Sequence, residues 1–180
     1  PEDAVVHYSE GGGDHYGFAV ANLGDVDGDG MTDVAFGVPY GDAEVNNGGE
    51  VMVFSAPDLT TERVPEDATV RFTGPDSKAR AGTSLRGPGD VNGDGYADLL
   101  IGAHEYAHDG GLLLQAGSAF VQLGSGTGWA STSLSDAHLR MYEVLAEQST
   151  GRFIGAPGDI DGDGLADVMV TAHRWDAGDR

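Results

Sequence analysis

One pattern rich in Asp and Gly occurs three times in this chain and constrains its fold more than any other feature. The three copies align without gaps and read GDVDGDGMTDV, GDVNGDGYADL and GDIDGDGLADV, at residues 24–34, 89–99 and 158–168. Their first acids are separated by 65 and 69 residues, at Asp25, Asp90 and Asp159. A glycine also lies eight residues before each first acid. A fixed period of this length is typical of repeat proteins, in which one supersecondary unit recurs.

The segments around each copy favour short β-strands. They are apolar runs of four to six residues, alternating or continuous, and they are bounded by Gly, Pro and Asn. No segment predicts a helix longer than two turns. A repeat unit of four strands corresponds to one blade of a β-propeller. We therefore predict an all-β fold of four-stranded antiparallel blades, with strands near 33–38, 50–54 and 69–72 in the first unit, and near 82–87, 97–102, 118–123 and 138–142 in the second.

The chain is too short to close a propeller, which takes four to eight blades. We expect one repeat region with about 2.5–3 blades and about eleven strands. Because the chain opens on Pro1 and holds no whole number of units, we expect a piece of a longer protein, an assembly of several copies, or an open stacked array. The expected parts are a strand of a preceding blade in 1–15, a first blade in 16–80, a second in 81–149 and a partial third in 150–180.

Oxygen-bearing residues recur at positions 1, 3, 5 and 9 of each loop, counted from the first acid. A tight loop aims alternate side chains at one point, and the glycine at position 6 permits the turn. Position 7 would add a backbone carbonyl. An all-oxygen shell of this size suits Ca²⁺ better than Mg²⁺, and Zn²⁺ would require His or Cys. We predict three calcium sites, with ligands Asp25, Asp27, Asp29, Met31 and Asp33; Asp90, Asn92, Asp94, Tyr96 and Asp98; and Asp159, Asp161, Asp163, Leu165 and Asp167.

Because these loops are strongly negative, we hypothesise that calcium binding is coupled to folding of the chain. Neighbouring carboxylates repel by about 1 kcal/mol per pair or more even when solvated, so the loops should splay without a cation. Asp-Gly runs are often ordinary turns, but three copies in register favour cation binding. An EF-hand would need Glu at position 12 and then a helix. Position 12 is Phe36, Ile101 or Val170, inside apolar runs typical of strands.

The loops and their surroundings resemble the FG-GAP repeat of integrin α-chain β-propellers and their bacterial relatives. That family is named for Phe-Gly before the first strand and Gly-Ala-Pro after the second. Both signatures are degraded here: the pairs read Tyr16-Gly17, Ala81-Gly82 and Thr150-Gly151, and the triplets read Gly37-Val38-Pro39, Gly102-Ala103-His104 and Thr171-Ala172-His173. The resemblance implies calcium at the loop positions given above. It also implies a ligand side opposite the calcium, built from the loops that join strands two and three and those that join blades.

A zinc-hydrolase motif, H-E-x-x-H, occurs at His104-Glu105-Tyr106-Ala107-His108. Its chemistry needs both histidines on one face of a helix, with the Glu as general base. The repeat register argues against a helix, because His104 takes the place of Pro39, at the start of a loop. The extended form of the motif also requires a third His at the position that Leu114 occupies. We therefore interpret the segment as an exposed polar loop.

The composition of the chain excludes several classes of partner and of structural stabilisation. The chain has 30 Asp and Glu against 9 Lys and Arg, a net charge of -21, so we expect no nucleic acid and no anionic membrane surface as partner. The sequence contains no run of 18 apolar residues, so we expect no membrane insertion. The absence of Cys excludes a disulfide framework, and bound metal would stabilise the fold in place of disulfides.

These features lead to one main functional hypothesis and one alternative. The main hypothesis is a calcium-binding adhesion or ligand-binding repeat module, extracellular or at a cell surface, with structural calcium. Its partners would be a protein or glycan ligand, and other copies of the chain through open blade edges. The alternative is a zinc-dependent hydrolase around His104, or an accessory domain of an enzyme. An exposed aromatic or Leu patch on the face opposite the calcium would favour binding.

Overall fold

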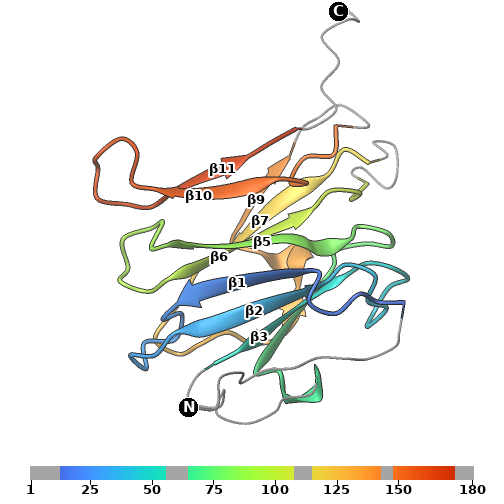
Figure 1. The fold of residues 1–180 in the computed structure, drawn as a ribbon, viewed down its shortest axis with the longest axis horizontal. Coiled ribbons are helices and arrows are strands. Elements are labelled where there is room, and N and C mark those ends of the chain that lie inside the picture. The colour runs from blue at the N-terminus through green and yellow to red at the C-terminus, as the bar shows by residue number, and fades with distance from the viewer. Residues whose placement is uncertain (1–12, 56–64, 108–114, 143–147, 173–180) are drawn as a thin grey trace, which may run out of the picture.

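The computed structural model describes residues 13–55, 65–107, 115–142 and 148–172 (Figure 1). In these ranges every regular element is a β-strand except two 3-10 turns, Pro65–Asp67 and Leu134–Asp136. The all-β class predicted from the sequence is confirmed. No helix in the described ranges has the length and apolar character that a membrane span requires.

Three separate sheets follow one another along the chain. The first has the order β1-β2-β3-β4-β8, the second β5-β6-β7-β9, and the third contains β10 and β11. Within these sheets, all strand pairings are antiparallel except β4 with β8. The strands are β1 (Ala19–Gly24), β2 (Asp33–Val38), β3 (Glu50–Phe54), β4 (Val70–Thr73), β5 (Ala81–Gly89), β6 (Asp98–Ala103), β7 (Ser118–Gln122), β8 (Thr132–Ser133), β9 (Leu139–Tyr142), β10 (Ile154–Gly158) and β11 (Asp167–Val170).

The sequence pattern placed these strands closely. Strands β2 and β3 have the predicted bounds, and those of β4, β5, β6, β7 and β9 differ from the prediction by one or two residues. The sheets do not close into a ring, which agrees with an incomplete set of blades. The expected strand of a preceding blade, at residues 4–8, lies outside the described residues. The division into blades at residues 15, 80 and 149 stays a prediction.

Strand β8 has no counterpart in the prediction. It lies in the connection between β7 and β9 and pairs in parallel with β4 of the first sheet, Phe72 with Thr132. Two side chains of the same connection anchor it: Leu134 is buried, and Trp129 packs edge-on against Phe72 with 5.4 Å between ring centroids. The second unit thus covers the outer edge of the first sheet, which removes an unpaired strand edge.

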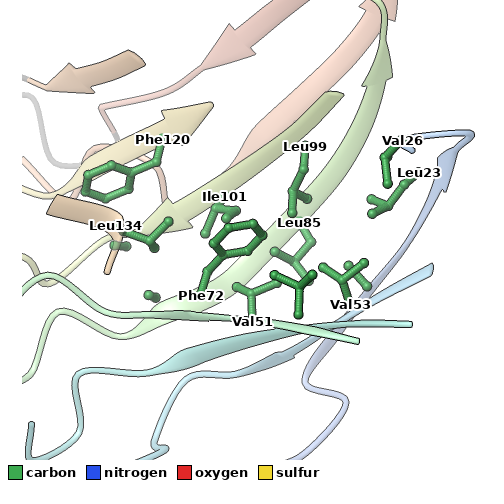
Figure 2. Close-up of a cluster of buried hydrophobic side chains, with 14 of the residues drawn as sticks. Leu23, Val26, Val51, Val53, Phe72, Leu85, Leu99, Ile101, Phe120 and Leu134 are labelled. Atoms are coloured by element: carbon green, nitrogen blue, oxygen red, sulfur yellow. The ribbon is translucent and has the colours of Figure 1, made fainter. Parts of the chain in front are cut away.

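Alternating side chains divide the core into layers. One face of the first sheet meets the second sheet, and Figure 2 shows Val51, Val53 and Phe72 beside Leu85, Leu99 and Ile101. The other face of the first sheet carries Val38, Met52 and Phe54. A third cluster, with Leu100 and Val121, packs the second sheet against β10 and β11. The period of two in the strands therefore produces a stack of three sheets, in which the second lies between the first and the third.

Neighbouring sheets approach most closely at pairs of glycines. A Cβ placed on Gly37 would lie 2.0 Å from the carbonyl oxygen of Gly82, and one on Gly102 would lie 2.0 Å from that of Gly151. Gly82 and Gly151 are the glycines that precede the loops by eight residues. This explains why they keep the period of the repeat. They mark the contact between consecutive units, where a side chain has no room.

Candidate metal centre

The three Asp-rich loops lie at the same end of the sheets, on the left in Figure 1. Each joins the first two strands of its sheet, over residues 25–32, 90–97 and 159–166. The acid at position 9 is in each case the first residue of the second strand, Asp33, Asp98 or Asp167. The predicted place of the loops, between the first two strands of each unit, is confirmed.

The first acid organises the turn of each loop. In the first loop, Gly28 N–H donates to Asp25 Oδ1 at 2.6 Å and Gly30 N–H donates to Asp25 Oδ2 at 2.9 Å. Both glycines have positive φ, 80° and 85°, which a residue with a side chain rarely adopts. The same two bonds recur at 2.6 and 2.8 Å in the second loop and at 2.7 and 2.9 Å in the third.

The acids at positions 3 and 5 turn inward toward the first. Asp27 Oδ1 accepts the N–H of Asp29 at 3.2 Å, and Asp29 Oδ1 accepts the N–H of Met31 at 2.7 Å. One carboxylate oxygen from each of Asp25, Asp27 and Asp29 lies within 4.8 Å of the others, and Asp159, Asp161 and Asp163 form the same group. Two ligands on opposite sides of a Ca²⁺ ion lie about 5 Å apart, so each group fits one such ion.

The second loop differs because Asn92 stands at position 3. Its Oδ1 accepts the N–H of Asp94 at 3.1 Å, as the acid does in the first loop, but its Nδ2 donates to Asp94 Oδ2 at 2.9 Å. The amide therefore relieves part of the repulsion that a third carboxylate would create. This loop keeps the backbone geometry of the others with one negative charge fewer.

The acid at position 9 is tied to the loop backbone. Its Oδ2 accepts the N–H of position 2 in all three loops, at 3.0 Å from Val26, 2.7 Å from Val91 and 2.7 Å from Ile160. Asp33 and Asp98 have no exposed surface. Oδ1 of Asp98 also accepts the N–H of Gly124 at 2.7 Å. Position 9 thus closes the loop onto its strand; its role as a metal ligand stays a prediction, as does that of the position 7 carbonyl.

The two ends of the second loop differ in their affinity for protons. Burial raises the pKa of Asp98, and repulsion from Asp94 and Asp90 adds to this, although the N–H groups of Val91 and Gly124 oppose it. The pKa of Asp90 lies below its ordinary value. Desolvation by burial alone would raise it, but four backbone hydrogen bonds, led by that from Gly95, together outweigh this effect. The loop therefore keeps an ionised acid at position 1 close to a buried acid whose charge is unfavourable.

Successive loops touch one another, which sequence reasoning missed. The N–H of Ala97 donates to Asp25 O at 2.9 Å, and that of Ala166 donates to Asp90 O at 2.8 Å. The side chain at position 7 covers the position 4 glycine of the preceding loop, as the ring of Tyr96 does over Gly28. The signal in the sequence was a glycine at position 4 of every copy.

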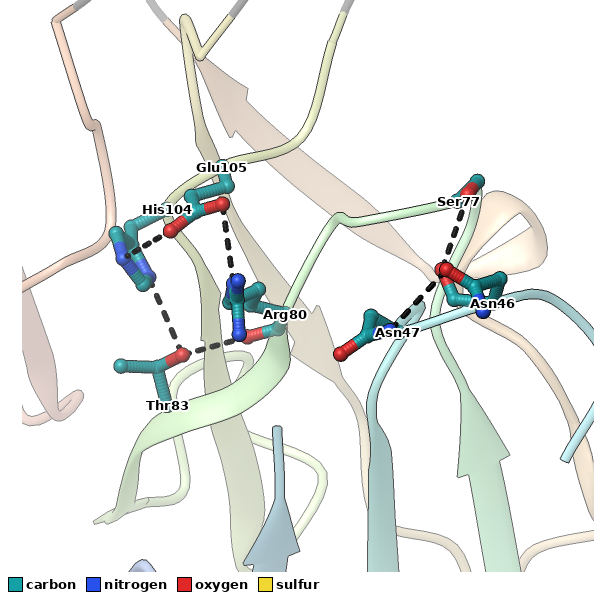
Figure 3. A network of polar contacts seen from close by, with 7 residues as sticks. All are labelled: Asn46, Asn47, Ser77, Arg80, Thr83, His104 and Glu105. Carbon is teal, nitrogen blue, oxygen red and sulfur yellow. Dashed lines mark hydrogen bonds and ion pairs between the residues drawn. The ribbon is translucent and has the colours of Figure 1, made fainter. Parts of the chain in front are cut away.

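The zinc-motif segment is not helical in its described part, residues 104–107, which form a turn after β6. Glu105 Oε2 pairs with Arg80 Nε at 3.0 Å, and Oε1 lies 3.5 Å from His104 Nε2 (Figure 3). His104 Nδ1 lies 3.2 Å from Thr83 Oγ1. His108 lies outside the described residues. Glu105 is thus held in an ion pair, whereas a general base needs a free carboxylate. The repeat register predicted the conformation of this segment better than the zinc motif did.

Comparison with known proteins agrees with the repeat. The sequence model of the FG-GAP repeat matches residues 16–54 and 81–114. Integrin alpha-PS5 of Drosophila melanogaster is 32% identical over 177 residues, 96% of this chain and 16% of the relative. Integrin alpha-PS3 of the same organism is 28% identical over 168 residues, 92% and 14%. Human integrin alpha-IIb is 37% identical over 90 residues, 49% and 8%.

The chain therefore spans less than a fifth of the length of each of these relatives. The match to integrin alpha-PS5 runs through nearly all of the chain, including the three loops and the sheets that carry them. This chain contains FG-GAP repeats, and it is similar in sequence to integrin α chains.

Proposed function

We propose that this chain is a calcium-stabilised ligand-binding module of the extracellular space or a cell surface. The observation that carries the proposal is the threefold loop: acids at positions 1, 3 and 5 converge on one point in the first and third copies, and Asn92 replaces the position 3 acid in the second. An exposed group of carboxylates held this close is unfavourable unless a cation shares it. The relatives are named as integrin α chains, so adhesion or binding of a protein or glycan ligand is the function most consistent with them.

Calcium acts as a structural element in this proposal. All donors are oxygens, no His or Cys stands in the loops, and the loops have the turn geometry of a cage of about seven ligands. Each loop is in contact with the next, so an ion in one loop also steadies the junction between units. The proposed ligands are the residues at positions 1, 3, 5, 7 and 9 of the three loops, as given in the sequence analysis.

The proposed ligand side is the end of the sheets opposite the loops. There the connections from β2 to β3 and from β6 to β7 begin, at Pro39 and His104, and the chain enters β5 from the first unit. Calcium and ligand would then be separated by the length of a strand, roughly 20 Å for six residues. No reaction is assigned to the module, since Glu105 and His104 are engaged with each other and with Arg80 and Thr83.

Association of copies through open blade edges remains part of the proposal, with one restriction. Gly37 and Gly102 permit the close contact with the following unit, and Thr171 stands at the equivalent position of the third unit. A side chain at that position opposes a further unit packed at the same short distance. Contact between copies would therefore use a different surface, such as the outer edge strand β9, where Leu139 and Tyr142 are exposed.

Calcium titration of the chain and of Asn92→Asp tests this proposal. We expect wild type to bind three calcium ions, with the second loop weakest because it has one charge fewer. Asn92→Asp should tighten that site about fivefold, since a unit charge about 4 Å away contributes about 1 kcal/mol in water. Isothermal titration calorimetry, with Asn46→Asp as a control that adds the same charge at the opposite end, measures this. A titration that Asn92→Asp leaves unchanged would contradict the assignment.

A further inference from the structure

A hollow of about 300 Å³ lies beside the long connection from β7 to β9, where this connection reaches the edge of the first sheet. Residues of the connection, Phe72 of β4 and Gln122 at the end of β7 form its wall. This volume is at the lower limit of pockets that hold small ligands, so it has room for one ring and not for a chain. Gln122 pairs with Leu99, next to the loop acid Asp98, so the hollow is separate from the ligand side proposed above.

Hydrogen bonds to both units fix the shape of the connection. The N–H of Gly124 donates to Asp98 Oδ1 at 2.7 Å, and that of Ser125 donates to Val26 O at 3.0 Å. Ser125 Oγ also donates to Gly128 O at 3.1 Å, which closes the glycine-rich turn. The hollow is therefore part of the packed junction between two units, and its wall is held in place on both sides.

One indole ring offers apolar surface to the hollow. Trp129 lines it and is only partly buried in the core. Its ring packs edge-on against Phe72, and its Nε1 donates to Leu123 O at 2.5 Å, so the indole is held in one orientation. Aromatic rings with a few polar groups beside them are typical of sites for small ligands.

A buried amide in the wall lacks one partner. Gln122 is 2% exposed, and its Oε1 lies 2.8 Å from His138 Nδ1. Its Nε2 is buried and forms no hydrogen bond to the described residues. A buried polar group without a partner is unfavourable, and a ligand group that reaches it removes this cost. A hydroxyl is suited to the free end of the amide whichever way the amide is turned, because a hydroxyl both donates and accepts.

The charges at the rim of the hollow oppose an anionic ligand. Asp136 is the one carboxylate of the wall, the wall contains no Lys or Arg, and Asp136 Oδ1 has no partner among the described residues. A phosphate, sulfate or carboxylate would therefore meet a negative charge without a permanent cation to balance it.

The donors in the wall oppose a cationic ligand. If Gln122 Nε2 faces the hollow, it is a free donor. If the amide is turned, His138 Nδ1 accepts from it and the imidazole proton is on Nε2, which has no partner among the described residues. The wall has a free donor in both cases. An ammonium ion would be attracted by Trp129 and Asp136, but it has only donors and cannot pair with that group.

We propose that this hollow binds the terminal pyranose ring of a neutral glycan, with hydroxyls on Asp136 and on the Gln122 amide and with the C–H face of the ring against Trp129. A pyranose has the apolar face, the donors and the acceptors that the wall requires, in one ring and without charge. The site is additional to the ligand side proposed above and depends on different residues, so either can fail without the other.

Methyl glycosides titrated into the ¹⁵N-labelled, calcium-loaded chain test the proposal. The probes are methyl β-D-glucopyranoside, methyl β-D-galactopyranoside and methyl α-D-mannopyranoside, with methyl β-D-glucuronoside and ethylammonium chloride as charged comparisons. At least one neutral glycoside should shift the NMR signals of the Trp129 indole and the Gln122 side-chain amide, and both charged probes should bind more weakly.

Two substitutions in the wall distinguish a sugar site from a structural amide. Asp136→Asn should weaken glycoside binding about fivefold, because a hydrogen bond to a charged group becomes one to a neutral group. Gln122→Leu should weaken it about fivefold as well, but should preserve or raise the midpoint of thermal unfolding, since it removes a buried polar end that has no partner. Asp76→Asn, the same change as Asp136→Asn at an exposed turn outside the hollow, should leave binding unchanged.

The opposite results overturn the proposal. No shift with any of the three neutral glycosides, or tighter binding of the glucuronoside or of ethylammonium, would show that the hollow does not select a neutral sugar. A Gln122→Leu chain with a lower midpoint and unchanged glycoside binding would show that the amide is structural. If that chain loses both stability and binding, Asp136→Asn decides, and unchanged binding in Asp136→Asn then contradicts the site. Calcium content is measured in the same samples, so that its absence counts against the proposed function and not against this inference.

Discussion

We expect removal of calcium to lower the midpoint of thermal unfolding, Tm, of this chain by about 10–20 °C. At about 2 mM calcium and a dissociation constant near 0.1 mM, one ion stabilises the folded state by roughly 1.8 kcal/mol. Three such sites contribute about 5 kcal/mol, and each kcal/mol changes Tm by about 2–4 °C for a chain of this length. Because the loops contact one another and the glycine junctions, the loss should affect the whole stack. Differential scanning calorimetry before and after chelation measures the change.

Two controls distinguish a specific calcium effect from general screening of charge. Magnesium at the same concentration should restore only a small part of the lost Tm, since it prefers a smaller shell that retains water. Sodium chloride of equal ionic strength should restore less than calcium. A Tm that chelation leaves within 1–2 °C of its starting value would show that the loops fold and hold their shape without the ion.

We expect substitution of Gly102 by Ala to destabilise the chain by about 3 kcal/mol, near the upper part of the usual range for overpacking. The added Cβ would lie 2.0 Å from the carbonyl oxygen of Gly151 and 2.2 Å from Ser84 Oγ. The first of these is backbone, so the third sheet must move away from the second. Gly102 does not have positive φ, and the cost therefore comes from the lost contact and not from backbone strain. Chemical denaturation measures the free energy of unfolding.

Gly13→Ala is the matched control for this substitution. No atom outside its chain neighbours lies within 4 Å of a Cβ at Gly13, and its φ is not positive. The same added methyl group should leave the free energy of unfolding within about 0.5 kcal/mol of wild type. If Gly102→Ala and Gly13→Ala had equal stability, the close junction between units would not hold the stack together.

Local patterns in the sequence predicted a large part of this fold. Strands β2 and β3 have their predicted bounds because continuous apolar runs there begin directly after Asp33 and Glu50 and end at Val38 and Phe54. The loops could be placed because three copies in register fix position 9 as the start of a strand. The turn at His104 followed from the register as well, although a helix motif covers the same residues. For the loops and for this turn, the repeat carried information that a single segment does not.

Contacts between units could not be predicted in the same way. Strand β8 has two residues and forms because Trp129 and Leu134 reach the first unit, some 60 residues earlier in the sequence. One cavity at the end of the sheets opposite the loops is lined by Arg80, Arg86 and Arg152. The first two adjoin or lie in β5 and the third precedes β10, so no short window of sequence contains all three. Such features depend on how the sheets stack, which is decided by side-chain packing across the units and not by periodicity within one.

A crystal structure of the chain grown in calcium, with an anomalous difference map, tests the central claim most directly. We predict three peaks, one in each loop, with oxygen ligands at about 2.3–2.6 Å and with Asp25, Asp90 and Asp159 among them. The weakest peak should lie in the second loop, where Asn92 replaces an acid. Loops with no peak, or a single peak beside His104 and Glu105, would contradict the account.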